Sequence, residues 1–348
     1  MIRSKTGKIR TARFVRGGRP RRIQFTHSYE DIISVENLLG AWREFVRGKL
    51  KKQDVQEFQS NLMDNVLALH RDLKQKTYAH GRYEAFKIND PKPRDIHKAS
   101  VRDRLVHHAI YCILYPFFDR TFIVDSYSCR EGKGTHRAMN KFRSYAFKVS
   151  KNHTQTAWVL KCDIRKFFAS IDQEILMRIV ARYIPDPDIQ ALIGKVVGSF
   201  HSTAPGKGLP LGNLTSQLLV NIYMNEFDQF VKHKLKARCY VRYADDFVIL
   251  SSSRKDLAEI LAHIKAFLAL RLNLLVHPDK VSITTVASGV DFLGWVHFPD
   301  HRVLRTSTKR RMLRRIQEDG REAVRESYGG LLQHGNAVKL QLCIESVE

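Results

Sequence analysis

The sequence is poor in cysteine, in long apolar runs and in acidic residues, and each shortage excludes a class of protein. Its 348 residues include five cysteines, an odd number without a C-x-x-C pair. Neither a disulfide framework nor a zinc site is expected, and each thiol is predicted to be reduced and buried in the core. No apolar run approaches the ~20 residues that span a bilayer, and the N-terminus lacks the apolar stretch of a secretory signal. We therefore expect a cytoplasmic protein with no membrane partner.

The shortage of acidic residues points to a polyanionic partner. Lys and Arg total 59 against 35 Asp and Glu, a formal net charge of +24. Such an excess is typical of proteins that bind nucleic acid. The basic residues are concentrated in an acid-free N-terminal segment and again in residues 302–315. The chain is also long enough for about two or three packed subdomains.

Hydrophobic periodicity predicts a mixed helix and strand protein. The expected elements are helices within 35–75, a helix beginning near Arg102, a strand ending at Asp163, a helix over 214–235 with Asn213 as its N-cap, a hairpin over 239–250, a helix over 254–272, a second hairpin with Pro299 and Asp300 in its turn, and a basic helical tail from Arg302.

Three carboxylates stand where apolar strands end. Asp163 closes one strand, and Asp245 and Asp246 occupy the tip of the hairpin written CYVRYADDFVIL. A lone Asp-Asp pair is most often a turn, because Asp tolerates turn geometry. Three acids at the ends of neighbouring strands instead require a cation, since packed carboxylates repel one another. Oxygen ligands suit Mg²⁺, and two such ions catalyse nucleotidyl transfer. We predict two Mg²⁺ ions here, with Mn²⁺ as an alternative.

These residues carry a family resemblance. The segment RYADDFVIL resembles the Y-x-D-D signature of reverse transcriptases, and LKCDIRKFFASID resembles the first catalytic motif of that family. Four further segments resemble family motifs in the same order, namely KPRDIHKASVRDRLVHHAI, GLPLGNLTSQLLVNIYMNEFD, LNLLVHPDKV and VDFLGWVHF. The resemblance covers about residues 35–340.

The resemblance implies an α/β (α+β) right-hand polymerase, with fingers, a palm built on an antiparallel sheet backed by helices, and a short helical thumb. The implied boundaries are a basic arm over 1–34, fingers over 35–155, a palm over 156–300 with a finger insertion at about 181–205, and a thumb over 301–348.

The resemblance also implies roles for single residues. Asp163, Asp245 and the backbone carbonyl of Ile164 would bind the metal ions, and Asp246 would complete the acidic cluster. The implied nucleotide-binding residues are Arg94, Arg104, Phe168, Leu211, Gln217 and Lys280, with Phe168 excluding a 2′-hydroxyl. The implied primer and template contacts are Tyr243, Gly294, Trp295, Arg310 and Arg314. As alternatives, Phe168 and Tyr243 would be core residues, and the arginines a solvated basic face.

One loop departs from the common family pattern. Leu211 precedes Gly212 and Gln217 follows Ser216, and this pattern resembles reverse transcriptases of diversity-generating retroelements, as do DSYSCREGKGTHRAM and SYGGLLQHGNAVKL. That subgroup implies error-prone copying of an RNA template into an RNA/DNA duplex from dNTPs, with a small basic accessory protein as a further partner. Two alternatives stay open, an antiphage-defence reverse transcriptase and a non-catalytic RNA-binding scaffold.

Overall fold

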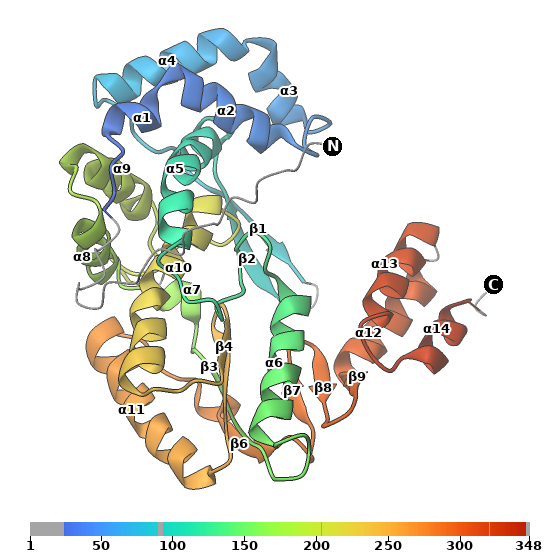
Figure 1. Cartoon of the computed structure of the whole chain (residues 1–348). Helices are drawn as coiled ribbons and strands as arrows, with labels where there is room; N and C mark the ends of the chain where they lie inside the picture. The colour runs from blue at the N-terminus through green and yellow to red at the C-terminus, as the bar shows by residue number, and fades with distance from the viewer. Residues whose placement is uncertain (1–23, 90–92, 203, 320, 346–348) are drawn as a thin grey trace, which may run out of the picture.

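The computed structural model describes residues 24–89, 93–202, 204–319 and 321–345. A central sheet lies between a group of helices at the N-terminal end and a smaller group of strands and helices at the C-terminal end (Figure 1). In the parts of the chain that the structure describes, no helix combines the length and the apolar character needed to cross a membrane.

The central sheet has four antiparallel strands in the order β4–β5–β3–β6. These strands are β3 Trp158–Asp163, β4 Tyr240–Tyr243, β5 Asp246–Ser251 and β6 Ser282–Thr285. The hairpin β4–β5 and the end of β3 at Asp163 match the sequence prediction. Because β3 pairs directly with β5, the end of β3 lies beside the tip of the hairpin.

Both faces of this sheet are buried, because successive side chains of a strand point to opposite faces. Leu160 and Ile249 are cross-strand partners on the face covered by α10 (Leu214–Gln229) and α11 (Arg254–Leu272). Val159 and Leu250 are partners on the other face, in the cluster that includes Phe142 of α6 (Thr135–Val149). Thus α6 packs on the central sheet, although the predicted boundary at residue 155 assigned it to the fingers.

The N-terminal group is helical apart from one exposed hairpin. Its helices are α1 Tyr29–Ile33, α2 Val35–Val46, α3 Gln53–Ser60, α4 Leu62–Lys74 and α5 Val101–Asp119, with α7 Phe167–Ser170, α8 Gln173–Tyr183 and α9 Pro187–Gly198 beside them. The hairpin pairs β1 Glu84–Ile88 with β2 Arg94–Lys98. Phe25 is only 3% exposed and Ile32 and Ile33 are buried. Residues 25–33, which the predicted basic arm included, therefore contribute to the helical core; the basic residues of that arm lie outside the described residues.

The C-terminal group has a core of its own. A three-stranded sheet, β7 Val290–Phe292, β8 Trp295–His297 and β9 Arg302–Leu304, leads into α12 Thr306–Glu318, α13 Glu322–Leu332 and α14 Val338–Glu345. Trp295, Met312, Ile316 and Leu332 form the centre of this core. The second predicted hairpin is present as β8–β9. A further strand, β7, pairs with β8, and the chain reverses between them at Leu293 and Gly294, which both have positive φ values.

Other predicted elements differ in detail. The predicted helix over 214–235 ends at Gln229 and continues as a π-helical turn, Phe230–Lys234. Asn213 is its N-cap by position, but its side chain makes no capping hydrogen bond. Cys162 and Cys239 are buried as predicted, whereas Cys129 is exposed, and the four described cysteines are all free thiols. A 3-10 turn, Pro278–Lys280, precedes β6.

Candidate active site

The structure brings Asp163, Asp245 and Asp246 together at one edge of the central sheet. Asp163 at the end of β3 lies directly opposite Asp246 at the start of β5. Asp245 occupies the two-residue turn between β4 and β5, and the Ile164 N–H donates a hydrogen bond to its carbonyl at 3.2 Å. Three carboxylates that are distant in sequence are therefore held by one hairpin and its neighbouring strand.

Burial and neighbouring carboxylates disfavour the ionisation of Asp245 and Asp246. Burial and the Asp163 carboxylate raise the pKa of Asp245, while Lys280 and Arg94 oppose the shift. Burial raises the pKa of Asp246 to about 7; the Lys161 ammonium opposes this shift, and Asp245 and Asp163 add to it. Without more positive charge, Asp246 would be partly protonated near neutral pH.

Two lysines now supply part of that charge. Lys280 Nζ lies 3.0 Å from Asp163 Oδ2, and Lys161 Nζ lies 4.0 Å from Asp246 Oδ2. Asp246 Oδ1 is buried and has no hydrogen-bond partner. An unpartnered buried carboxylate oxygen is costly unless a cation reaches it.

The oxygen atoms of these three carboxylates are suitable ligands for a hard divalent cation, and they lie together at one edge of the sheet. Nevertheless, within the described residues no three Asp, Glu, His or Cys side chains are arranged to hold a metal ion as they stand. Asp163, Asp245 and Asp246 are the residues that would hold one. Their side chains would have to rotate toward it, and Lys280 would have to release Asp163.

Two predicted nucleotide-binding residues lie close to this cluster. Arg94 is exposed at the start of β2, within electrostatic range of Asp245, and Lys280 contacts Asp163 directly. Phe168 is partly buried in α7, and its carbonyl accepts a hydrogen bond from Leu209 N–H at 2.9 Å. The 209–213 loop is thereby fixed next to the residues that follow Asp163.

Arg104 and Gln217 line one pocket of about 360 Å³, together with Gly212 and Asn213. The Arg104 guanidinium is paired with Asp54 of α3, so a contact with a triphosphate would compete with this ion pair. Leu211 does not line the pocket, but its carbonyl accepts a hydrogen bond from His97 N–H of β2 at 3.1 Å.

The predicted primer and template contacts are more scattered. Tyr243 pairs with Asp246 across the hairpin, and its hydroxyl accepts a hydrogen bond from Thr135 Oγ1 at 3.2 Å. Gly294 lies in the β7–β8 turn at φ 86°. Trp295 is only 1% exposed, so its predicted contact with primer or template is wrong for the side chain, which instead packs in the C-terminal core. Arg310 and Arg314 are exposed on α12.

Sequence reasoning missed two charged residues of the site. Lys161 on β3 lies beside Asp246, and Arg242 on β4 is buried and donates a hydrogen bond to the Ala244 carbonyl in the turn. Both interrupt apolar strands, in VLKCD and YVRYA. A basic residue within a buried strand was the available signal, because such a residue must have a partner.

The antiparallel sheet with acids at its edge, backed by helices and flanked by two further helical groups, defines a right-hand polymerase fold. The family model described as "Reverse transcriptase (RNA-dependent DNA polymerase)" matches residues 87–297, which is more than half of the chain. The chain belongs to the reverse transcriptase family.

Curated relatives include intron-encoded proteins. Protein YkfC of Escherichia coli K12 is 27% identical over 259 residues, covering 63% of this chain and 65% of YkfC. The group II intron-encoded protein LtrA of Lactococcus lactis is 24% identical over 294 residues, covering 65% of this chain and 47% of LtrA. The chain thus spans less than two thirds of either relative.

A solved telomerase structure from Candida albicans aligns with a TM-score of 0.51 at 10% identity, over 67% of this chain and 48% of that one. At this level of identity the likeness concerns the fold alone.

Proposed function

We propose that this protein is an RNA-directed DNA polymerase. The observation that carries the proposal is the direct pairing of Asp163 with Asp246, with Asp245 in the adjoining turn. Asp163, Asp245 and the Ile164 carbonyl would hold two Mg²⁺ ions, or Mn²⁺, and Asp246 would complete the cluster. When bound, such ions activate the attacking 3′-oxygen and stabilise the leaving pyrophosphate.

The protein's own side chains would orient the substrates. Arg94 and Lys280, both near the carboxylates, suit the triphosphate of an incoming dNTP. Phe168 would select the deoxyribose, Leu211 and Gln217 would contact the nucleotide from the 209–217 region, and Arg104 would contact it from α5. Tyr243 and Gly294 would support the primer end, and Arg310 and Arg314 on α12 would hold the RNA/DNA duplex through phosphates.

Primer extension tests this proposal. On poly(rA)/oligo(dT) with Mg²⁺ we expect dTTP incorporation by the full chain, and we expect Asp245→Ala to lower kcat by at least ~10³-fold while the duplex still binds. Asp300→Ala is the matched control, because Asp300 is an exposed acid on the β8–β9 turn. An active Asp245→Ala protein would refute the polymerase assignment. A wild-type chain that binds RNA but extends no primer would favour the scaffold alternative.

We further propose that the enzyme belongs to a diversity-generating retroelement and copies with errors opposite template adenine. The aliphatic Leu211 supports this, since it cannot donate hydrogen bonds to a nascent base pair. Leu211→Gln keeps the backbone contact to His97 and is expected to lower the adenine error frequency by about tenfold. Sequencing of the cDNA measures this, with errors at the other three template bases as the internal control. An unchanged adenine error rate would leave the antiphage-defence alternative in place.

A further inference from the structure

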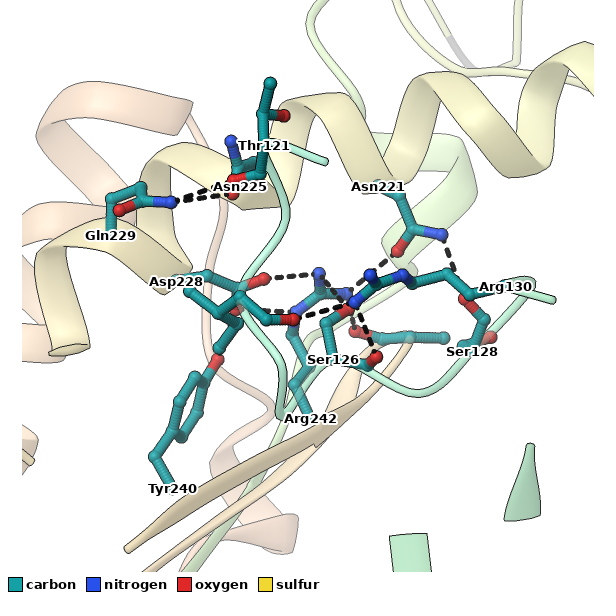
Figure 2. A network of polar contacts seen from close by, with 12 residues as sticks. Thr121, Ser126, Ser128, Arg130, Asn221, Asn225, Asp228, Gln229, Tyr240 and Arg242 are labelled. Carbon is teal, nitrogen blue, oxygen red and sulfur yellow. Dashed lines mark hydrogen bonds and ion pairs between the residues drawn. The ribbon is translucent and has the colours of Figure 1, made fainter. Parts of the chain in front are cut away.

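Arg242 is a fully buried cation directly behind the candidate active-site turn. It lies on β4, one residue before Tyr243, and is 1% exposed; its partner Asp228 on α10 is 0% exposed. Arg242 Nε donates to Asp228 Oδ1 at 2.8 Å, and Nη2 donates to Asp228 Oδ2 at 2.6 Å (Figure 2). This two-bond geometry is available to Arg and not to Lys.

The remaining donors of the guanidinium reach three other residues, two of them in other parts of the fold. Nη1 donates to the Ala244 carbonyl at 3.1 Å and lies 3.4 Å from Asn221 Oδ1 on α10. Nη2 also donates to Ser126 Oγ at 3.0 Å. One side chain therefore joins α10, the loop after α5 and the turn that carries Asp245.

The backbone of Arg242 is fixed in the same way. Its N–H donates to the Asp125 carbonyl at 3.0 Å, and its own carbonyl accepts from Tyr127 N–H at 2.9 Å. Residues 125–127 thus add a short parallel pairing to the outer edge of β4. Asn221 Nδ2 donates to the Ser128 carbonyl at 2.9 Å and holds the same loop from α10.

The Ala244 carbonyl belongs to the most constrained residue of the hairpin. Ala244 adopts φ 54°, in the left-handed region that disfavours side chains with a Cβ. Such a conformation persists only where the surrounding structure holds it in place. The hydrogen bond from Arg242 Nη1 is one restraint that acts on this turn from inside the protein.

We propose that Arg242 is a positioning residue, whose guanidinium fixes the 244–246 turn and so sets Asp245 and Asp246 relative to Asp163. The inference rests on the proposed polymerase function. Stability alone is a poor reason for this ion pair, because packed apolar side chains often stabilise a protein as well as a buried pair does. An apolar pair could not hold the Ala244 carbonyl.

A pair of variants separates positioning from stability. Arg242→Lys keeps a positive charge for Asp228, but one ammonium cannot span the distance from Asp228 to both Ala244 and Ser126. Tyr240→Phe is the matched control. Tyr240 is equally buried on the same strand and donates to the same Asp228 Oδ1 at 2.7 Å, but no bond joins its hydroxyl to the turn.

Both variants are expected to lower Tm. Only Arg242→Lys is expected to lower kcat, by about tenfold or more. In the same variant we expect the Mg²⁺ concentration at half-saturation to rise several-fold, while KM for dTTP and duplex affinity stay within about twofold of wild type. If kcat falls equally in the two variants for an equal loss of Tm, Arg242 has only a structural role and the proposal is overturned.

Two further measurements keep the test decisive. If Arg242→Lys does not fold, Ser126→Ala removes one anchor of the guanidinium and leaves the ion pair intact. It is expected to raise the Mg²⁺ half-saturation about twofold, and no change would overturn the proposal.

If the wild-type chain extends no primer, the polymerase function fails, and Mn²⁺ binding measured by electron paramagnetic resonance decides the positioning role. Arg242→Lys should then bind Mn²⁺ several-fold more weakly than Tyr240→Phe, and equal binding would overturn it.

Discussion

At the scale of single residues, the partly buried carboxylate of Asp246 destabilises the folded protein when it is ionised. Its side chain is 21% exposed, one of its oxygens has no hydrogen-bond partner, and burial raises its pKa from 3.8 to about 7. Because the folded-state pKa exceeds the unfolded value, the native protein binds more protons than the unfolded chain between about pH 4 and pH 7. Stability is therefore expected to fall as the pH rises through that window.

Removing this charge should stabilise the metal-free protein. In EDTA at pH 8 we expect Asp246→Asn to increase the free energy of unfolding by about 1–2 kcal/mol, allowing for the carboxylate's partial exposure, and to raise Tm by a few degrees. The gain should disappear below about pH 3, where Asp246 is protonated in both the folded and the unfolded state. Thermal unfolding across this pH range measures it, with the exposed Glu174→Gln as the control. A gain that is constant with pH would show that ionisation is not its cause.

The sequence predicted the three acids because each stands at the end of an apolar strand, where a carboxylate is conspicuous. It did not predict that Lys161 and Arg242 lie among them, since strand alternation does not say which side chain will meet which partner. For Trp295 it gave the wrong environment. The indole is covered by Met312 and Leu332 from helices that follow β9, and their packing depends on long-range contacts.

At the scale of elements, the loop before α10 is docked onto the exposed β1–β2 hairpin. His97 of β2 donates its N–H to the Leu211 carbonyl and accepts from Asn213 Nδ2 at 3.0 Å. Gly212 lies between these two contacts at φ 101°, and a Cβ there would meet Ile96 Cγ2 at 3.0 Å. The amide nitrogen of Asn213 is directed toward β2 by this contact, and its side chain makes no capping hydrogen bond to the helix.

Substitution of Gly212 should disturb this docking. We expect Gly212→Ala to lower the free energy of unfolding by about 1–2 kcal/mol, because position 212 has a positive φ. The added Cβ should also displace Ile96 and thereby raise KM for dNTP several-fold. Gly206→Ala is the control, because Gly206 has φ 72° but no atom within 4 Å of the position of a Cβ. Steady-state primer extension and thermal unfolding of both variants measure this. Equal effects on KM would mean that the contact with Ile96 has no role in dNTP binding.

Elements with one strong pattern could be predicted from the sequence, and elements made by tertiary contacts could not. The helix over 254–272 was predicted with the observed ends, because Ser253 accepts from Asp256 N–H as an N-cap and Asn273 ends the helix in the left-handed conformation. The helical pattern over 35–75 did not reveal its breaks at Arg47–Lys52 and Asn61. The pairing of residues 125–127 with β4 had no local signal, since its partner is more than 100 residues away.

At the scale of the whole molecule, part of the excess of basic residues lies on α12 of the C-terminal group. The apolar face of α12, with Met312 and Ile316, packs inward, while Arg310 and Arg314 point to solvent. Arg302 attaches this group to α6, because Nη1 donates to Asn140 Oδ1 at 3.1 Å and Nε donates to the His334 carbonyl. The basic face of α12 is therefore held in a fixed relation to the central sheet.

If this face holds a duplex through phosphates, its contribution must depend on salt. Each phosphate contact releases counterions, so we expect Arg310→Gln/Arg314→Gln to reduce the slope of log affinity against log salt by about 2 for an RNA/DNA duplex. Single-turnover extension of bound duplex should stay within about twofold of wild type, since neither residue touches the carboxylates. Fluorescence anisotropy at several salt concentrations measures the slope.

The control is Arg178→Gln/Arg254→Gln, which removes the same charge from exposed positions on α8 and α11. If this control lowers the slope as much as the α12 pair, net charge rather than the face of α12 determines duplex affinity.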